Sequence, residues 1–286
     1  MSGPLLVVDA PSMLFRAFYA LPDTIKGADG RPVNALLGTA NLILREVEQH
    51  RPRAVVLCFG PDAADYRVEL FDGYHAERPE VPETLAPQFL ASRAFFEAFG
   101  WTVAVSDSLE ADDLLGAYAR RETEAGGRTL VMTGDRDMFQ CVGDSVQVLY
   151  VRTGGKQDAK LVDAAEVRRR YEMPPKLVPD FIALRSDPSD GIPGAKGIGE
   201  KTAAELLQRH GSLEEALERG VRETRPSVRA ALCTQADELR AFKEIATLQD
   251  VDVELPPDTP TDYAGAAAAA REVGMERLAK RLEQLA

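Results

Sequence analysis

The stretch from Glu110 to Asp137 reads EADDLLGAYARRETEAGGRTLVMTGDRD, and it sets acidic residues at the start of a helix pattern and at the end of a strand pattern. Glu110, Asp112 and Asp113 begin the helix pattern, whereas Asp135 and Asp137 follow the strand pattern. If the strand returns the chain to where the helix begins, both groups face the same point. Two carboxylates in contact already force one of them to hold a proton, so such a group usually needs a cation. Oxygen ligands suit Mg²⁺ or Mn²⁺, and the stretch therefore predicts a site for more than one metal ion.

The composition is that of a globular chain. Its 286 residues, 45% of them hydrophobic, suffice for one large or two modest domains. No apolar run approaches the ~18 residues of a membrane span, and the N-terminus lacks the basic segment of a secretory signal. The three cysteines have no CxxC spacing and the three histidines are not paired. We therefore expect free thiols in a reducing cytosol and no zinc site.

The charge of the chain is compatible both with the absence and with the presence of a nucleic-acid ligand. A net charge of −12 argues against a nucleic-acid ligand, because phosphates are bound by Lys and Arg. Net charge is an average, however, and acids gathered in a metal site are compatible with local basic patches.

Short apolar runs alternate with helix patterns in the first half of the chain, which predicts a mostly parallel sheet with right-handed crossovers. After about Leu161 the patterns are helical, apart from a possible short strand over 251–255. The expected strands are 5–9, 53–59, 101–105, 129–132 and 145–151, and the expected later helices are 163–171, 175–184, 200–210, 213–218 and 228–248. The segment 73–87, with three prolines, is expected to be a surface excursion.

The acidic residues recur where expected strands end. Asp9 follows the first strand, and Asp187 and Asp190 lie where the helical half begins. The carboxyl ends of parallel strands share one edge of a sheet, so the first groups should converge there. Two metal ions about 4 Å apart would use such a set to hold a scissile phosphate and activate water. Each group alone could instead cap a helix or form a turn, but their repeated placement favours the metal site.

A second motif, Ile192-PGAKGIGEKT-Ala203, places glycines before a helix pattern. A Gly-x-Gly turn at a helix N-terminus exposes backbone N–H groups to a phosphate. Lys196 and Lys201 add positive charge, so a clamp on a nucleic-acid backbone is favoured over a simple helix–helix turn. Such a clamp reads no bases, and binding should depend on the structure of the nucleic acid rather than its sequence.

These motifs together resemble the 5′ nuclease family, which includes the N-terminal domain of bacterial DNA polymerase I, bacterial flap endonucleases and bacteriophage 5′ exonucleases. The resemblance runs from Leu5 to about Leu248, and the chain looks like a stand-alone member. It implies a PIN-like α/β fold, with a mostly parallel sheet flanked by helices and a helical C-terminal helix–3-turn–helix region. The nuclease core would span 1–162 with an arch at about 73–95, and the duplex-binding region would span 163–286 with the helix–3-turn–helix at about 180–220.

The resemblance also implies roles for individual residues. One metal site would use Asp9, Glu110, Asp112 and Asp135, a second would use Asp137, Asp187 and Asp190, and Asp113 would support both through water. Arg16, Tyr74 and Arg78 match positions that touch the 5′ strand near the cleavage point, and the Pro32–Ile43 segment matches the helix at the duplex junction. The duplex backbone would be held by the turn and the start of its helix, often with a K⁺ ion: Lys196, Gly197, Ile198, Gly199, Lys201 and Thr202.

The chain departs from the family pattern at two positions. Gly60 stands where the family usually has Asp, so either Asp62 substitutes from a shifted loop or a water fills the place. His75 stands where the family has the Lys that neutralises the scissile phosphate. Protonated His75 would do the same, and the alternative is an exposed loop histidine.

The resulting hypothesis is a structure-specific 5′ nuclease that uses two or three Mg²⁺ or Mn²⁺ ions to remove 5′ flaps and 5′-terminal nucleotides in DNA replication and repair. Water would attack the phosphodiester in line, leaving a 5′-phosphate and a 3′-hydroxyl. The alternatives are a PIN-type ribonuclease and a non-catalytic structure-specific DNA-binding protein. The expected setting is a cytoplasmic monomer at the nucleoid, with duplex DNA carrying a 5′ end or flap as ligand and DNA polymerase I or a sliding clamp as candidate partners.

Overall fold

A single twisted sheet organises the structure, a computed structural model that describes residues 3–152 and 159–286. The strand order is β3-β2-β1-β4-β5-β6; the first five strands are parallel and β6 is antiparallel to β5. The strands are β1 (Leu5–Asp9), β2 (Ala54–Phe59), β3 (Thr102–Val105), β4 (Thr129–Thr133), β5 (Val146–Tyr150) and β6 (Lys160–Val162). The mostly parallel sheet is confirmed, and β6 was not expected.

The alternation of side chains along β1 divides the core in two. Leu5 and Val7 face one hydrophobic cluster, whereas Leu6 and Val8 face the other. All four side chains are fully buried, as expected for a parallel strand covered by helices on both faces. Helix α5 (Ala111–Glu124) packs on the first face.

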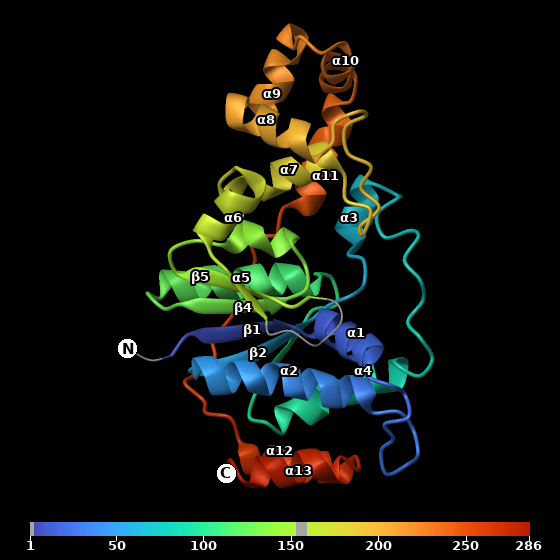
Figure 1. Ribbon diagram of the computed structural model, residues 1–286, viewed down its shortest axis with the longest axis vertical. Helices are drawn as coiled ribbons and strands as arrows, with labels where there is room; N and C mark the ends of the chain where they lie inside the picture. Colours follow the sequence, from blue (N-terminus) through green and yellow to red (C-terminus); the bar gives the residue numbers. More distant parts are fainter. Residues whose placement is uncertain (1–2, 153–158) are drawn as a thin grey trace.

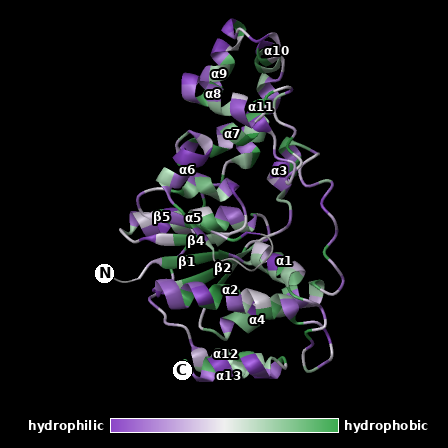
Figure 2. Ribbon diagram, in the orientation of Figure 1, coloured by the Kyte–Doolittle hydropathy of each residue, from purple (hydrophilic) through white to green (hydrophobic). Residues whose placement is uncertain are grey.

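The second face is covered by helices from both ends of the chain (Figure 1). They are α1 (Ala10–Ala20), α2 (Asn34–His50), α4 (Ala86–Glu97), α12 (Tyr263–Glu272) and α13 (Glu276–Glu283). Figure 2 shows hydrophobic strands at the centre and more hydrophilic helices around them.

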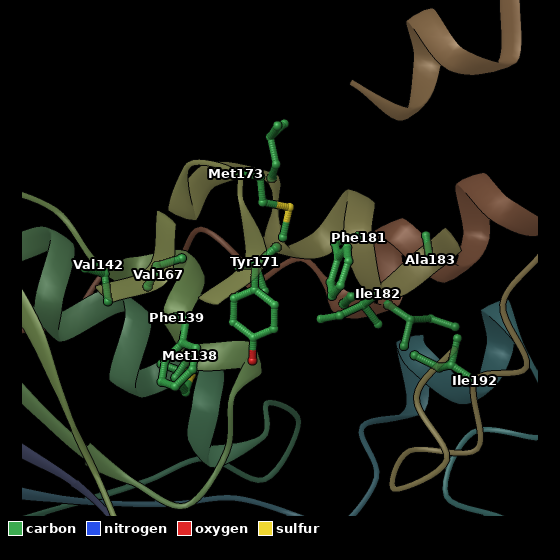
Figure 3. Close-up of a cluster of buried hydrophobic side chains, with 14 of the residues drawn as sticks. Met138, Phe139, Val142, Val167, Tyr171, Met173, Phe181, Ile182, Ala183 and Ile192 are labelled. Atoms are coloured by element: carbon green, nitrogen blue, oxygen red, sulfur yellow. The ribbon is translucent and has the colours of Figure 1, made fainter. Parts of the chain in front are cut away.

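The helical region rises from the first face of the sheet. It consists of α6 (Ala164–Tyr171), the 3₁₀ turn η2 (Pro175–Leu177), α7 (Val178–Arg185), α8 (Glu200–His210), α9 (Leu213–Arg219), η3 (Gly220–Arg222), α10 (Pro226–Thr234) and α11 (Ala236–Ala246). The single helix expected over 228–248 is wrong, because the chain bends at Gln235 between α10 and α11. Buried side chains of the 3₁₀ turn η1 (Asp137–Cys141), α6 and α7 form one cluster that joins this region to the sheet (Figure 3).

After α11 the chain runs back along the core to reach α12 and α13. Arg53 holds this segment against the core. Its guanidinium donates to Glu122 Oε1 of α5 at 2.9 Å and to Pro256 O of the segment at 2.8 Å. The backbone N–H of Thr259 donates to Arg53 O at 2.7 Å. Residues 251–255 form no strand, so that expectation is wrong, and the last two helices pack beneath the sheet rather than in the helical region.

The segment between the short helix α3 (Asp65–Leu70) and α4 is a chain of turns followed by an extended span (Figure 1). It contains most of the expected arch, and its end enters α4 at Ala86. Within the described ranges, no helix is long and apolar enough to cross a membrane.

Candidate metal centre

The carboxyl ends of the parallel strands open into a cleft of about 570 Å³. Five predicted metal ligands line it, namely Asp9, Glu110, Asp112, Asp135 and Asp190, together with Arg16, Tyr74 and Arg78. The lining also contains Phe15, Val81 and Phe89. The structure therefore brings residues from three stretches of the sheet edge and from the helical half into one place.

Asp9 is held at the end of β1 by its neighbours. As the N-cap of α1, its Oδ1 accepts from Ser12 N at 3.0 Å, and its Oδ2 accepts from the Thr133 hydroxyl at 2.7 Å. Thr133 Oγ1 also accepts from Asp135 N at 3.0 Å, so one residue of β4 orients both acids. A strand end that is also a helix N-cap explains why a carboxylate occurs here.

Arg67 is a buried partner of the acids that the sequence analysis did not anticipate. It is fully buried in α3, and its Nη1 lies 2.8 Å from Glu110 Oε2 and 3.1 Å from Asp112 Oδ2. Its Nη2 lies 3.0 Å from Asp113 Oδ1. A helix of six residues is too short for periodicity to mark its inward face, so the sequence carried no signal for this contact.

Tyr74 and His75 join the arch to the metal centre. The Tyr74 hydroxyl donates to Glu110 Oε2 at 3.0 Å. The rings of Tyr74 and His75 stack with their centroids 3.8 Å apart. His75 is buried, its Nε2 is 3.2 Å from Asp190 Oδ1, and its Nδ1 faces Asp62 O. The alternative of an exposed loop histidine is therefore wrong, since both ring nitrogens have protein partners, and the role of His75 toward the phosphate stays a prediction.

Asp190 also receives the guanidinium of Arg78, whose Nη2 donates to it at 2.9 Å. Arg78 Nη1 donates to Asp62 Oδ1 at 3.1 Å, and the Asp62 side chain is 66% exposed. Asp62, the residue considered as a substitute for the aspartate missing at Gly60, therefore lines the cleft as a partner of Arg78.

The remaining three acids are buried beside the cleft rather than in its lining. Asp113 accepts from Arg67, from the Tyr66 hydroxyl at 3.0 Å and from Gln249 N at 2.9 Å. Asp187 accepts from Arg185 at 3.0 Å and from Ser189 N at 3.0 Å. Asp137 donates its backbone N–H to Asp135 Oδ1 at 2.9 Å.

The acids interact strongly enough to change one another's proton affinity. Burial raises the pKa of Glu110 to about 7, and the charge of Asp112 adds to the rise. Burial and repulsion from Asp190 raise the pKa of Asp135 to about 7. Burial also raises the pKa of Asp9 and of Asp137, and for Asp137 repulsion from Asp135, Asp190 and Asp187 contributes. The protein itself does not neutralise these charges fully, which is the electrostatic setting of a cation site.

Asp190 is the exception among these acids. Burial would raise its pKa, but hydrogen bonds and charge from His75 and Arg78 outweigh burial and hold the pKa below its ordinary value.

The donor set fits Mg²⁺ or Mn²⁺, because every side chain offered is a carboxylate. As the side chains stand, no three acidic, histidine or cysteine side chains in residues 3–152 and 159–286 are grouped to hold one ion. The carboxylates point instead toward protein donors such as Thr133, Arg67 and Arg78. Each carboxylate keeps lone pairs beyond these hydrogen bonds, so an ion would be bound alongside the protein donors or after small shifts of the side chains.

Steric crowding explains why a glycine stands at position 60. A Cβ at this position would lie 2.2 Å from Leu109 O and 2.7 Å from Glu110 Cα. The loop after β2 thus packs directly against the start of α5, and the backbone leaves no space for the aspartate that the resemblance led us to expect here.

The glycine turn before α8 is open. A Cβ at Gly199 would meet nothing within 4 Å, and a Cβ at Gly197, which has φ +79°, would meet only Ser227 Cβ at 3.8 Å. Lys196 and Lys201 are exposed, whereas the side chain of Ile198 is buried and anchors the turn in the core. Thr202 Oγ1 accepts from Arg225 at 3.1 Å, so Arg225 adds a further cation beside α8.

Comparison with known proteins agrees with this architecture. Residues 4–172 match the 5′-3′ exonuclease N-terminal resolvase-like domain, and residues 173–267 match the 5′-3′ exonuclease C-terminal SAM fold. The chain is 38% identical over 300 residues to a 5′-3′ exonuclease of Streptomyces coelicolor, covering 97% of this chain and 98% of the relative. It is 39% identical over 237 residues to a 5′-3′ exonuclease of Mycobacterium tuberculosis, covering 76% and 74%.

Longer relatives and solved structures extend the comparison. DNA polymerase I of Chloroflexus aurantiacus is 36% identical over 260 residues, which are 89% of this chain and 27% of the polymerase. A structure of the bacteriophage T5 flap endonuclease, a pseudo-enzyme-product complex with DNA and metal ions, has the same fold with a TM-score of 0.69 at 15% identity and covers 98% of both chains. The catalytic core of Rad2 in complex with DNA substrate has a TM-score of 0.65 at 15% identity, covering 100% of this chain and 93% of that one. The chain therefore belongs to the 5′-3′ exonuclease family and is a 5′ nuclease.

Proposed function

We propose that this nuclease cleaves DNA at the junction of a duplex and an unpaired 5′ strand, using two or three Mg²⁺ or Mn²⁺ ions held by the acids of the cleft. The observation that carries the proposal is the convergence in one cleft of Asp9, Glu110, Asp112, Asp135 and Asp190, which come from separate parts of the chain. Their raised proton affinities support a group that is completed by cations.

We assign the ligands in two groups, as the resemblance implied. One ion would be held by Asp9, Glu110, Asp112 and Asp135, and a second by Asp137, Asp187 and Asp190. Asp113, which does not line the cleft, would support the site by holding Arg67, since its Oδ1 lies 3.0 Å from Arg67 Nη2. Ions bound there would polarise the phosphodiester and favour ionisation of the attacking water.

The side chains of the cleft would position the strand. Tyr74 fixes the Glu110 carboxylate through its hydroxyl, and burial raises the pKa of Tyr74, so the phenol stays a donor. Arg16 lies at the edge of the cleft, where its Nη2 donates to Gly134 O at 2.7 Å. Arg16 and Arg78, which both line the cleft, would contact the 5′ strand near the cleavage point.

The turn before α8 would hold the duplex backbone through N–H groups and Lys201, with Lys196 and Thr202 beside it. The space around Gly197 and Gly199 supports this, because a phosphate can approach the backbone closely. A K⁺ ion at the turn belongs to the same proposal. We also propose a monomer that works beside DNA polymerase I or a sliding clamp on chromosomal DNA in the cytoplasm.

Cleavage of a branched DNA tests the proposal. A duplex with a single-stranded 5′ flap, labelled at either end, should be cut near the junction in Mg²⁺ and in Mn²⁺ but not in EDTA, leaving 5′-phosphate and 3′-hydroxyl ends. Asp112→Asn should remove the cut, while Glu214→Gln, on the exposed side of α9, should keep it. Intact flap DNA after incubation of the native protein with either ion would refute the proposal.

A matched flap made of RNA tests the ribonuclease alternative. The glycine turn supports a duplex-binding enzyme, so an RNA flap on the same DNA duplex should also be cut at the junction. Cleavage of free single-stranded RNA with no preference for the junction would favour the ribonuclease. Tight junction binding without any cleavage in either metal would favour the non-catalytic DNA-binding protein.

A further inference from the structure

A row of aromatic rings crosses the junction between the sheet and the helical region, and the metal centre does not account for it. Four rings follow one another with centroids 5.6, 6.2 and 5.4 Å apart, in the order Tyr150, Phe139, Tyr171 and Phe181. They belong to β5, η1, α6 and α7 in turn, and Figure 3 shows the last three in the buried cluster that joins these elements. The row therefore connects the sheet to α7.

Three arginines cover this row. The guanidinium carbon of Arg136 lies over the first ring, 5.8 Å from its centroid, and Arg136 Nε donates to the hydroxyl of that tyrosine at 3.3 Å. Arg170 lies over the second ring at 5.7 Å, and Arg185 lies over the fourth ring at 5.4 Å. Burial raises the pKa of the Tyr171 phenol, and the charges of all three arginines oppose that rise. The three guanidiniums thus act on one hydroxyl, and we call these three residues the arginine strip.

Carboxylates compensate only part of the positive charge of the arginine strip, in a chain whose net charge is −12. Arg136 is exposed and is held by a phenol. Arg170 pairs with Glu166 at 3.2 Å, but Lys160 and Arg169 pair with the same carboxylate. An excess of cations at one place favours the binding of an anion.

Arg185 joins the strip to the metal centre. It pairs with Asp187 at 3.0 Å, and within the described chain its buried Nε has no hydrogen-bond partner. The charge of Arg185 also acts on Asp137, where it opposes the rise in pKa that burial causes. Both acids are proposed metal ligands. With Asp187 committed to an ion, the charge of Arg185 would be compensated less and would attract an anion more strongly.

The strip adjoins both places that are proposed to hold DNA. Arg136 follows β4 directly and stands between two of the proposed metal ligands in the sequence. At the other end, Arg185 is the last residue of α7, and the backbone N–H of Ala195 donates to Leu184 O at 2.9 Å. The loop with the glycine turn is thus attached to the end of α7. In the sheet, β4 and β2 flank β1 on opposite sides, and the arch follows β2, so the strip and the arch leave the sheet on different sides.

We propose that the arginine strip binds backbone phosphates of the duplex between the cleft and the turn before α8. The inference rests on the proposed function, because it needs duplex DNA engaged at the metal centre. The ions take the scissile phosphate, the arch takes the unpaired 5′ strand, and the strip takes phosphates of the paired region. Guanidinium groups suit this role, since their planar donors bind two phosphate oxygens at once. Such contacts read no bases.

Duplex binding at several salt concentrations tests the strip. A blunt DNA duplex and a DNA single strand, each labelled with fluorescein, are titrated with the protein in Ca²⁺, and anisotropy gives the binding constant. Arg136→Ala and Arg185→Ala should each weaken duplex binding about 10-fold, because each loses charge-assisted hydrogen bonds. Each should also lower the slope of log K against log salt by about 0.9, and the double variant by about 1.8. Binding of the single strand should stay within about a factor of two of the native value, because its phosphates do not reach the strip.

Two further variants serve as controls. Arg136→Lys keeps the charge, so the salt slope should stay native while duplex affinity falls less than in Arg136→Ala. Arg271→Ala removes an arginine of α12, beneath the sheet, that pairs with Glu283, and it should leave duplex binding unchanged. Unaltered salt slopes in both Arg136→Ala and Arg185→Ala would overturn the proposal.

Urea unfolding distinguishes phosphate binding from a packing role of these arginines. Arg136 is exposed, so Arg136→Ala should keep the native urea midpoint. A lower midpoint together with equal losses of binding for duplex and single strand would indicate packing and refute the strip.

Cleavage of flap DNA by the native protein, measured in Mg²⁺, separates this inference from the proposed nuclease activity. Flap cleavage with unaltered salt slopes in the alanine variants would refute only the strip. The expected loss of slope without any cleavage by the native protein would refute only the nuclease proposal.

Discussion

The cleft and the turn before α8 differ in how they would hold a phosphate. The cleft gathers carboxylates around the buried Arg67, and the pKa of several of them is raised by burial. The turn offers backbone N–H groups and exposed lysines, with open space around Gly199. The cleft repels phosphate until cations bind, whereas the turn before α8 attracts phosphate without added ions. Cleavage should therefore depend on ions, and duplex binding should not.

The largest expected effect comes from removing acids of the cleft. Asp187→Ala combined with Asp190→Ala should lower cleavage of a flap substrate about 1,000-fold or more, because the second ion loses its carboxylates. Duplex binding, measured in Ca²⁺, should stay within a factor of two of the native value.

The matched control for that experiment removes the same charge elsewhere. Asp237→Ala with Asp250→Ala alters two carboxylates whose side chains are 102% and 83% exposed, and it should leave cleavage unchanged. Retained Mg²⁺-dependent cleavage in the Asp187 and Asp190 double variant would remove these residues from the metal site.

The two glycines at the compared places should respond in opposite ways. Gly60→Ala puts a Cβ 2.2 Å from Leu109 O and should lower the free energy of unfolding by about 3 kcal/mol. Gly199→Ala places its Cβ in open space, so stability should change by less than about 1 kcal/mol while duplex binding weakens. Urea unfolding and duplex titrations of both variants check the pair, and equal stability losses would contradict it.

The pH dependence of stability should distinguish the cleft from the rest of the molecule. The pKa values of Glu110 and Asp135 are about 7 in the folded protein, above their ordinary values of 4.5 and 3.8. The folded state therefore binds more protons than the unfolded state between about pH 4 and pH 7, and this contribution to stability is lost as the pH rises through 7.

Urea unfolding in EDTA from pH 5 to pH 8 measures this effect. The part of the contribution that comes from Asp135 should disappear in Asp135→Asn while the part from Glu110 remains, and Mg²⁺ at pH 8 should restore stability because it favours the ionised acids. A contribution of these acids that instead grows toward pH 8 in EDTA would mean that their charges are already compensated in the fold.

The smallest effect is expected at the turn. Lys201→Ala should weaken duplex binding a few-fold and lower the slope of log K against log salt by about 0.9, since one phosphate contact is lost. The control is Lys280→Ala, on the exposed side of α13 beneath the sheet, far from the helical region (Figure 1). An unaltered salt slope for Lys201→Ala would place the duplex contact elsewhere.

Patterns within the chain were enough to predict the sheet and the acids at its edge. Asp9 and Asp135 follow buried apolar runs, and the parallel arrangement alone brings them together. Features that depend on distant contacts were missed or wrong. Arg67 has no periodic signal, Gln235 interrupts an unbroken helix pattern, and the strand expected over 251–255 is an irregular segment whose neighbour, Asp250, pairs with Arg120.

The positions of the first five strands along the chain, the acids after them and the glycine turn were determined by the sequence itself, because hydrophobic periodicity and turn residues act over a few neighbours. The tertiary structure decided which acids face the cleft, that Asp113 pairs with Arg67, and that Gly60 has no room for a side chain. It also decided that Phe15 meets Phe89, 74 residues further along the chain, beside the acids. These outcomes depend on packing between segments far apart in sequence, which no local pattern encodes.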